Sequence, residues 1–226
     1  MNKLAIVIPQ YTEELSQAET TSLHQALRLG RGVDIINVSP ERLRHNEDLL
    51  DPIFFPDRYF ESTHTYSELM LTHKFWESFI GYEYILIYQL DCLLLRDNLL
   101  EWCEMGYDYI GAPWLPGFAE EGEQFAAVGN GGFSLRKVSK HLEVFKVMGN
   151  VEVIPYPGHE DVAWSQEIPK QLPFINFKVA CPEVAKYFAV ETGVMLNKKL
   201  LKGKYPSGVH AWEKREPNYF KEIICN

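Results

Sequence analysis

The sequence is poor in cysteine and in positive charge, and it contains no long hydrophobic run. Only four cysteines occur in 226 residues, and none forms a C-x-x-C pair, which excludes zinc-ribbon and thioredoxin-like motifs. The formal net charge of -9 argues against a nucleic-acid-binding protein and against a polybasic membrane anchor, since both need clustered positive charge. No segment approaches the roughly 20 apolar residues of a membrane-spanning helix.

The N-terminal apolar run covers only residues 4–8 and stops at Pro9, so it is too short for a signal peptide. Without a disulfide motif, a reducing compartment is the simplest account of the cysteines. We therefore expect a soluble, cytoplasmic protein with no transmembrane segment and no nucleic-acid partner. The sequence leaves its oligomeric state open.

The order of apolar segments predicts an α/β fold. Residues 4–8 form a continuous β-branched run typical of a buried strand, a helix is predicted over 12–29 with Thr12 as its N-cap and Gly30 as its end, and 33–38 read as a second strand. Such a βαβ opening favours a mostly parallel sheet with helices on its faces. We predict one Rossmann-like domain over residues 1–226, with its core at about 4–214.

Further along the chain the same criteria predict a helix over 66–80, a strand over 83–91, a helix over 97–105, a strand over 107–110 and a helix over 137–148. The segment 111–132 is rich in glycine, proline and acidic residues, and reads as a loop that reaches over a site. Another short helix is expected from Glu160.

The predicted strand 83–91 ends in Gln89-Leu90-Asp91. Ligands of open α/β sheets bind at the carboxyl ends of the strands, and carboxylate oxygens suit Mg²⁺ or Mn²⁺. Asp91 is therefore a candidate ligand for a cation that bridges to a diphosphate. The alternative, that Asp91 only caps the following turn, stays open at this point.

Three further segments combine residue types that suit a binding site. Residues 129–132 read Gly-Asn-Gly-Gly, which permits close approach of a ligand to the backbone but also suits a tight turn; they match neither the P-loop nor the dinucleotide pattern. Glu160 and Asp161 open a helix, where acidic residues also complement the helix dipole. Four lysines within 198–204 precede His210 and Trp212, and they suit either a diphosphate or a solvated helix end.

In this order, the pieces resemble GT-A-type glycosyltransferases. The chain looks like a family of uncharacterised GT-A-like domains over about residues 4–214, and its glycine and Glu-Asp-Val motifs are similar to those of inverting galactosyltransferase-like enzymes. The motifs are Tyr-Gln-Leu-Asp at 88–91, Gly-Ala-Pro-Trp at 111–114, Gly-Asn-Gly-Gly-Phe-Ser-Leu-Arg at 129–136, Glu-Asp-Val at 160–162 and His-Ala-Trp at 210–212.

The resemblance implies a role for each matching position. Asp91 and His210 would hold Mn²⁺ or Mg²⁺, Asp161 would be the general base, and Glu160 would contact the acceptor. The nucleotide-sugar would lie against Pro9, Gln10, Tyr11, Lys74, Gln89 and Lys204. The donor and acceptor sugars would lie against Trp114, Asn130, Gly131, Gly132 and Trp212. One position departs from the family pattern, because Gln89 replaces the first Asp of the D-x-D motif.

These residues predict a metal-assisted hexosyltransferase, with a UDP-sugar as the favoured donor and a glycan or other hydroxyl compound as acceptor, as in polysaccharide biosynthesis. A cation and lysines can stabilise the charge that grows on a departing diphosphate, and a base activates the acceptor hydroxyl on the opposite face of an inverting enzyme. The alternative is a catalytically silent sugar- or nucleotide-binding module of the same fold, which the Gln89 departure favours. A metal-dependent hydrolase or nucleotidyltransferase is a third possibility, but the Gly-rich, Lys-containing N-terminal loop typical of nucleotidyltransferases is missing.

Overall fold

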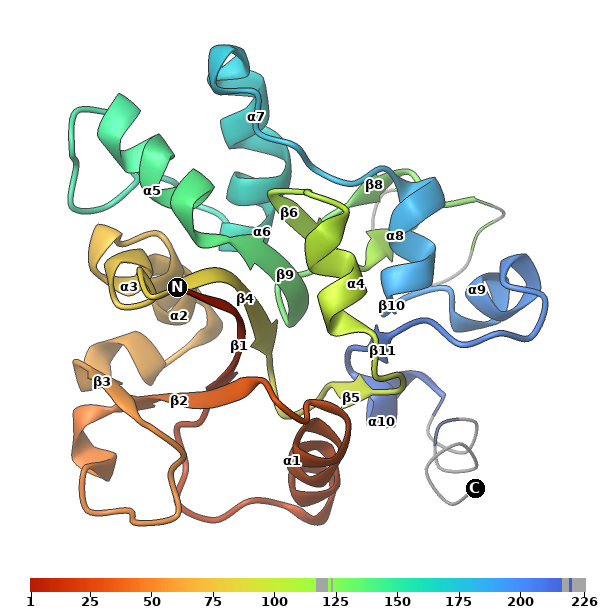
Figure 1. Cartoon of the computed structure of the whole chain (residues 1–226), viewed down its shortest axis with the longest axis horizontal. Helices are drawn as coiled ribbons and strands as arrows, with labels where there is room; N and C mark the ends of the chain where they lie inside the picture. Colours follow the sequence, from red (N-terminus) through yellow and green to blue (C-terminus); the bar gives the residue numbers. More distant parts are fainter. Residues whose placement is uncertain (117–121, 123, 217–219, 221–226) are drawn as a thin grey trace.

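A six-stranded sheet in the order β3-β2-β1-β4-β9-β6 forms the centre of the molecule (Figure 1). The computed structural model describes residues 1–116, 122, 124–216 and 220. The strands are β1 (Asn2–Pro9), β2 (Asp34–Pro40), β3 (Ile53–Phe55), β4 (Tyr82–Tyr88), β5 (Leu93–Leu94), β6 (Tyr109–Gly111), β7 (Pro113–Trp114), β8 (Ala127–Val128), β9 (Phe133–Lys137), β10 (Ala189–Val190) and β11 (Gly208–Val209).

Helices connect most of these strands. The α-helices are α1 (Gln17–Leu29), α2 (Thr63–Met70), α3 (His73–Glu77), α4 (Leu99–Glu104), α5 (Val138–Val147), α6 (Glu160–Val162), α7 (Ile168–Gln171), α8 (Pro182–Phe188), α9 (Val194–Leu200) and α10 (Trp212–Arg215). Short 3-10 turns lie at Glu41–Leu43, Asp57–Phe60 and Pro173–Ile175, and a π-helical turn lies at Ala163–Glu167.

Strands β3, β2, β1 and β4 pair in parallel, whereas β9 runs antiparallel to both of its neighbours, β4 and β6. The predicted α/β class, with a mostly parallel sheet flanked by helices, is thus confirmed. A second sheet of three short strands, β10-β11-β5, lies beside the first, to the right of β4 in Figure 1. A two-stranded ladder joins β7 to β8.

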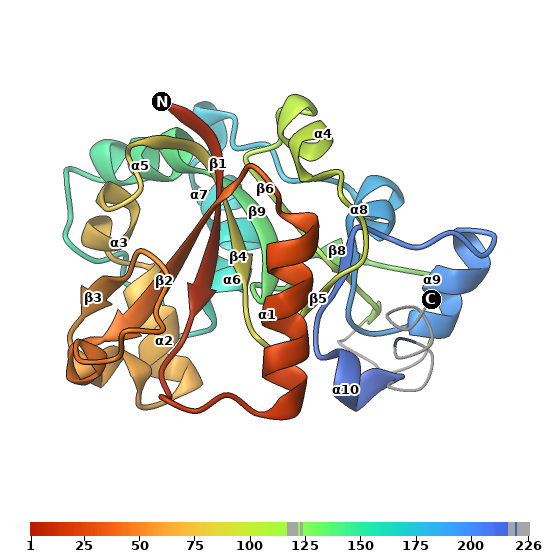
Figure 2. The ribbon, with the colours of Figure 1, turned by 60° about the horizontal axis from the view of Figure 1, so that its bottom comes forward.

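Both faces of the main sheet are buried, as the apolar run of β1 requires. Ala5 and Val7 pack into a cluster with residues of α2, α3 and α5, while Leu4, Ile6 and Ile8 pack on the other face with residues of α1, α4 and α8. Figure 1 shows α3 and α5 on one side of β4 and α4 and α8 on the other, and Figure 2 shows α1 along the sheet.

Helix α1 begins at Gln17, so the predicted start with Thr12 as N-cap is wrong. The N-cap is Ser16, whose hydroxyl accepts a hydrogen bond from the Glu19 amide at 3.2 Å, while the Glu19 carboxylate accepts one from the Ser16 amide at 2.8 Å. This capping box satisfies two backbone donors at once. The predicted end at Gly30 is confirmed, since Gly30 is the C-cap.

The single helix predicted over 66–80 is wrong as well, because the chain breaks it into α2 and α3. Thr72 caps α3 by accepting a hydrogen bond from the Phe75 amide at 3.2 Å. The carbonyl oxygen of Met70, released by the break, accepts hydrogen bonds from Trp76 Nε1 at 2.9 Å and Trp164 Nε1 at 3.2 Å. Two buried indoles thus find their acceptor at the break, a tertiary demand that helical periodicity does not reveal.

Strand β4 ends at Tyr88 rather than at Asp91, so residues 89–91 form the turn that follows it. Strand β9 lies between the predicted loop over 111–132 and the predicted helix over 137–148, at residues for which the sequence predicts no strand. The loop predicted at 111–132 contains β7 and β8, and its residues 117–121 and 123 lie outside the described residues.

Among the helices of the described residues, none has the length and apolar content needed to cross a bilayer. Cys92, Cys103 and Cys181 are free thiols. Cys225 lies outside the described residues.

A buried histidine makes stability depend on pH. The His141 ring is fully buried and stacks on Trp76 with ring centroids 3.8 Å apart, and burial lowers its pKa well below the usual value. Because the unfolded chain takes up this proton more readily than the folded one, the free energy of unfolding should fall as the pH drops below about 6.5, by up to about 1.4 kcal/mol per pH unit.

The check is urea unfolding between pH 7 and pH 5. His141→Phe keeps the stacked ring and should remove this part of the pH dependence, whereas His24→Phe, at an exposed position of α1, should leave it in place. An unchanged slope in the His141 variant would contradict the assignment.

Candidate active site

The small sheet brings together three residues that lie far apart in the sequence. Val209 of β11 pairs with Val190 of β10 on one side and with Leu93 of β5 on the other. Glu191 and His210 therefore leave two adjacent parallel strands at the same end. Asp91 lies on the far side of His210, because its carbonyl oxygen accepts a hydrogen bond from the Trp212 amide at 3.2 Å.

The side chains of these residues form a row of charges. His210 Nε2 lies 3.2 Å from Asp91 Oδ1, and His210 Nδ1 lies 3.2 Å from Glu191 Oε1. Lys214 Nζ lies 3.7 Å from the other carboxylate oxygen of Asp91. The Asp91 side chain is 38% exposed and that of His210 is 14% exposed, so ligands can reach the row from the Asp91 end.

The protonation of the row follows from its charges. Burial lowers the pKa of His210, but its contacts with the carboxylates of Asp91 and Glu191 outweigh burial and raise that pKa to about 9. Burial likewise raises the pKa of each carboxyl, and the contact with His210 outweighs it and lowers both. In the metal-free row the His210 imidazole is therefore protonated and positively charged, and it lies between two carboxylates. A cation would take the place of the added proton.

Asp91 and His210 fit a divalent cation. Asp91 Oδ1 is buried and accepts no hydrogen bond within the described residues. Its nearest charged neighbour is His210 Nε2, at 3.2 Å. Ligand atoms of Asp91, Cys92 and His210 all lie within 4.8 Å of one another. The Cys92 thiol is buried, its pKa is raised well above the usual value by burial, and it donates to the Gly132 carbonyl at 3.1 Å. It therefore stays protonated, which leaves a carboxylate and an imidazole as the ligands.

The glycine segment lies directly against this row. A Cβ atom on Gly132 would come within 2.4 Å of His210 Nε2 and 2.8 Å of Gln89 Oε1, and one on Gly131 within 2.4 Å of Glu160 Oε1. Hence only glycine fits at either position. The two residues separate His210 and Gln89 on one side from Glu160 and Asp161 on the other.

A buried ion pair holds the glycine segment from behind. Arg136 of β9 is fully buried, and its guanidinium donates to the two Glu160 oxygens at 2.5 and 2.8 Å. It also donates to Ser134 Oγ at 2.8 Å and to the Gly131 carbonyl at 3.4 Å, and it lies over the Tyr109 ring. Burial lowers the pKa of Arg136, but the Glu160 charge outweighs it and raises that pKa, so the guanidinium stays charged.

This pairing changes the role expected of Glu160. The residue is only 4% exposed and both carboxylate oxygens are bound by Arg136, so it is not open to an acceptor. Asp161 is half-buried at the start of α6, where Oδ2 accepts a hydrogen bond from the Gly131 amide at 3.1 Å and Oδ1 accepts one from the Val162 amide at 2.8 Å. Both acidic residues thus lie against the glycine segment, but Asp161, and not Glu160, has a carboxylate outside the buried ion pair.

A cavity of about 600 Å³ opens beside Asp91. It lies between the end of β1, the start of α2 and the turn after β4. Its lining includes Pro9, Tyr11, Ser62, Thr63, Tyr66, Gln89, Asp91 and Lys214. Pro9, Tyr11 and Gln89, which are expected at the nucleotide-sugar, thus line one cavity together with Asp91. Gln10 turns away, since its side chain is buried and accepts a hydrogen bond from Asn37 Nδ2 at 3.1 Å.

Of the residues expected at the site, only Pro9, Tyr11, Gln89 and Asp91 line this cavity, and four of the others lie away from it. Lys74 lies on α3, 75% exposed, and pairs with Glu77 at 3.5 Å. Lys204 lies in the exposed turn after α9. Trp114 is only 6% exposed and packs under Gly129, and Trp212 is 2% exposed in a cluster with Val190 and Val209. Both tryptophans expected at the sugars thus pack as core residues in the described structure.

Three residues of the site carry no role predicted from the sequence, namely Glu191, Lys214 and Arg136 as the partner of Glu160. Glu191 carries the same signal that singled out Asp91, a carboxylate directly after a short apolar segment that forms a strand. Lys214 lies two residues after Trp212, outside the lysine-rich segment 198–204. Arg136 was read only as the last residue of the glycine motif.

A family model described as a protein of unknown function (DUF5672) matches residues 50–210. The chain belongs to this family. The matched segment contains Asp91, the glycine segment, Arg136, the Glu160-Asp161 pair, Glu191 and His210. No curated protein matches the sequence.

The structure of this DUF5672 chain is similar to those of several glycosyltransferases. A glycosyltransferase involved in the glycosylation of the major capsid of PBCV-1 is 11% identical with a TM-score of 0.52, over 99% of this chain and 100% of that one. An active-site mutant of LgtC is 13% identical with a TM-score of 0.52, over 98% and 95% of the two chains. Glycosyltransferase GlyE from Streptococcus pneumoniae TIGR4 is 12% identical with a TM-score of 0.49, and the match covers 100% of this chain and 61% of that one. The two matches with TM-scores of 0.52 show that the DUF5672 chain has the GT-A-like fold found in glycosyltransferases.

The buried Arg136–Glu160 pair should be essential to stability. Glu160→Gln leaves a buried guanidinium without its counter-charge, and breaking such a pair typically costs about 3–5 kcal/mol. Glu143→Gln is the matched control, since Glu143 pairs with Lys140 at 2.7 Å with 43% of its side chain exposed, and such a pair contributes at most about 1 kcal/mol. Urea unfolding measures both losses, and equal small losses would show that the buried pair is not a structural constraint.

Proposed function

We propose that this DUF5672 chain is a metal-assisted glycosyltransferase that moves a sugar from a nucleoside-diphosphate sugar to a hydroxyl acceptor. The observation that supports this most directly is the Asp91–His210 pair, which lies at the carboxyl end of β4 beside a cavity of about 600 Å³. Ligands of open α/β sheets bind at that edge, and the GT-A-like fold is consistent with such a donor.

The charge of the cavity favours a cation-dependent donor. Its lining holds four carboxylates and one lysine, namely Glu19, Glu61, Asp91, Glu213 and Lys214. A diphosphate alone would be repelled by these carboxylates. A divalent cation, Mn²⁺ or Mg²⁺, would remove the repulsion and would stabilise the negative charge of the leaving diphosphate.

The residues of the chain then divide the remaining work. Asp91 and His210 hold the cation, and Lys214, next to Asp91, adds positive charge at the diphosphate. Tyr11 is 51% exposed at the cavity and offers a ring on which a base can stack, with UDP the favoured nucleotide. Gln89 presents an amide that can hydrogen-bond to the donor in place of a second metal-binding carboxylate.

Asp161 is the proposed general base of an inverting transfer. It lies across the Gly131-Gly132 segment from His210, and its carboxylate is oriented by the Gly131 amide at 3.1 Å. The donor and acceptor sugars would lie near Asn130, Gly131 and Gly132. Glu160 takes a positioning role through Arg136 instead of contacting the acceptor, which is a glycan or another hydroxyl compound.

Nucleotide binding should require the cation. UDP at about 100 times its dissociation constant, with Mn²⁺ present, adds roughly 2.7 kcal/mol of stability, equivalent to a rise in Tm of about 5–10 °C for a domain of this size. Asp91→Ala and His210→Ala should each abolish the metal-dependent part of the rise in a thermal-shift assay, and Asp97→Ala, at an exposed position in the same segment, should keep it. If no nucleotide shifts the Tm with Mn²⁺ or Mg²⁺, the proposed donor class is wrong.

Replacing the base should slow transfer without weakening donor binding. Asp161→Asn keeps the size of the side chain and its hydrogen bond from the Gly131 amide, but it cannot take up the acceptor proton, and a positioned base contributes about 10²–10⁴ in rate. Transfer from a panel of nucleotide-sugars measures kcat, and the thermal shift with UDP and Mn²⁺ should match that of the wild type. Normal turnover by this variant, or a product that keeps the donor's anomeric configuration, would refute the base assignment. Donor binding without any turnover by the wild type would instead favour a silent binding module.

A further inference from the structure

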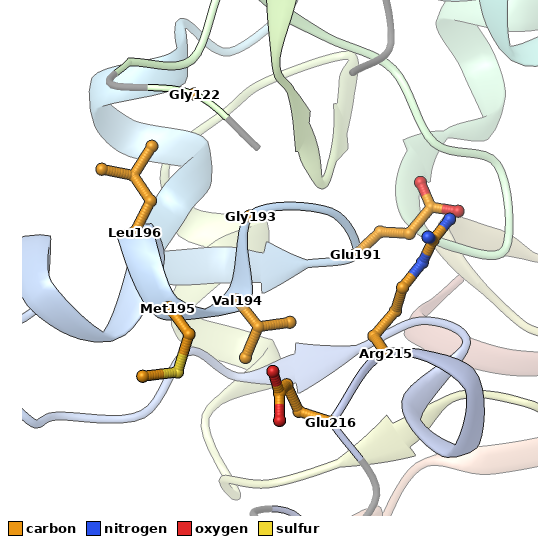
Figure 3. A pocket seen from close by; sticks show the side chains of 8 residues that line it. All are labelled: Gly122, Glu191, Gly193, Val194, Met195, Leu196, Arg215 and Glu216. Atoms are coloured by element: carbon orange, nitrogen blue, oxygen red, sulfur yellow. The ribbon is translucent and has the colours of Figure 1, made fainter. Parts of the chain in front are cut away.

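Glu191 has no part in the function proposed above, yet it is tied into the site by two contacts. Its Oε1 lies 3.2 Å from His210 Nδ1, and its Oε2 accepts a hydrogen bond from Asn130 Nδ2 at 2.8 Å. The Glu191 side chain is only 16% exposed. It forms one end of a second cavity, of about 400 Å³, where it and Arg215 point toward one another (Figure 3).

Asn130 is held in an unusual conformation beside these two residues. Its φ is 39°, in the left-handed region, and the residue is only 4% exposed. Its Oδ1 accepts a hydrogen bond from the Phe133 amide at 3.3 Å, which fixes the orientation of the amide group. Nδ2 therefore faces both Glu191 Oε2 and His210 Nδ1, each at 2.8 Å.

We propose that Glu191 is a positioning residue that keeps the His210 ring proton on Nδ1, so that the Nε2 lone pair faces the cation site at Asp91. This inference rests on the proposed metal-assisted function and assigns a residue that acts on the metal through His210. Histidines that bind metals commonly donate the proton of their other ring nitrogen to a carboxylate or carbonyl, which fixes both the tautomer and the ring orientation.

The hydrogen-bond inventory explains why Glu191 is needed. A neutral imidazole carries one N–H and one lone pair. The Asn130 amide nitrogen can only donate, so by itself it favours the lone pair on Nδ1 and the proton on Nε2, the tautomer that cannot bind a cation through Nε2. Glu191 Oε1 is an acceptor within reach of Nδ1, and Glu191 Oε2 takes up a proton of the Asn130 amide. Together these contacts favour the binding tautomer.

The backbone places Glu191 for this role. Val190 and Val209 are partners in the parallel pair β10–β11, and the His210 amide donates to the Val190 carbonyl at 2.9 Å. Glu191 is thus the residue next to His210 on the neighbouring strand. A residue at this position needs a side chain that reaches His210 Nδ1 and carries a hydrogen-bond acceptor, and Glu191 has both.

The test measures Mn²⁺ affinity directly, by the free Mn²⁺ signal in electron paramagnetic resonance with the purified full chain. Loss of an outer carboxylate typically weakens metal binding by about 10–100-fold, and we expect a loss in this range for Glu191→Ala. Glu191→Gln keeps one acceptor oxygen and should lose less. Glu216→Ala is the matched control, because Glu216 lines the same second cavity, and it should bind Mn²⁺ like the wild type.

A second measurement reports the tautomer itself. With Mg²⁺, which is diamagnetic, the ring ¹⁵N shifts of His210 should place the proton on Nδ1 in the wild type and on Nε2 in Glu191→Ala. Wild-type Mn²⁺ affinity in a folded Glu191→Ala variant, or a wild-type ring protonated on Nε2 in the presence of bound Mg²⁺, would overturn the positioning role alone. Absence of cation binding by the wild type would overturn the proposed function and this inference with it.

Discussion

The buried pair of Arg136 and Glu160 is the interaction on which the arrangement of the site depends. A guanidinium without solvent is stable only beside a counter-charge with its hydrogen bonds satisfied, and here Glu160, Ser134 and the Gly131 carbonyl supply them. Since the pair joins β9 to the start of α6, it also fixes where the glycine segment and Asp161 lie. The row formed by Asp91, His210 and Glu191 then packs against Gly132.

Two kinds of electrostatic environment thus lie on opposite sides of the same two glycines. Behind them, charges are compensated within the protein and no ligand is needed. In front of them, carboxylates outnumber the single lysine of the cavity lining, and His210 bears a proton that a cation can replace. The side with Arg136 and Glu160 therefore suits a structural role, and the side with Asp91 and His210 suits a binding role, although carboxylates and cationic side chains form both.

Sequence reasoning identified the α/β class and several of the positions that the structure brings together, because those signals are local. A carboxylate just after a buried strand marked Asp91, and consecutive glycines marked the close approach at Gly131 and Gly132. The failures share a different cause. The break between α2 and α3, the burial of Trp114 and Trp212, and the pairing of Arg136 with Glu160 all depend on partners distant in sequence. Strand β9 was missed for the same reason, as Ser134 and Arg136 are polar residues that the fold buries completely.

The brevity of the small sheet has a consequence for how the protein folds. Strands β5, β10 and β11 contain two residues each, and their pairing closes long loops, so little local structure favours it and much chain entropy opposes it. The main sheet, with four neighbouring parallel strands and local βα connections, can form without it. Asp91, Glu191 and His210 should therefore meet late in folding and separate early in unfolding, in a part of the chain whose amides exchange with solvent sooner than those of β1 and β4.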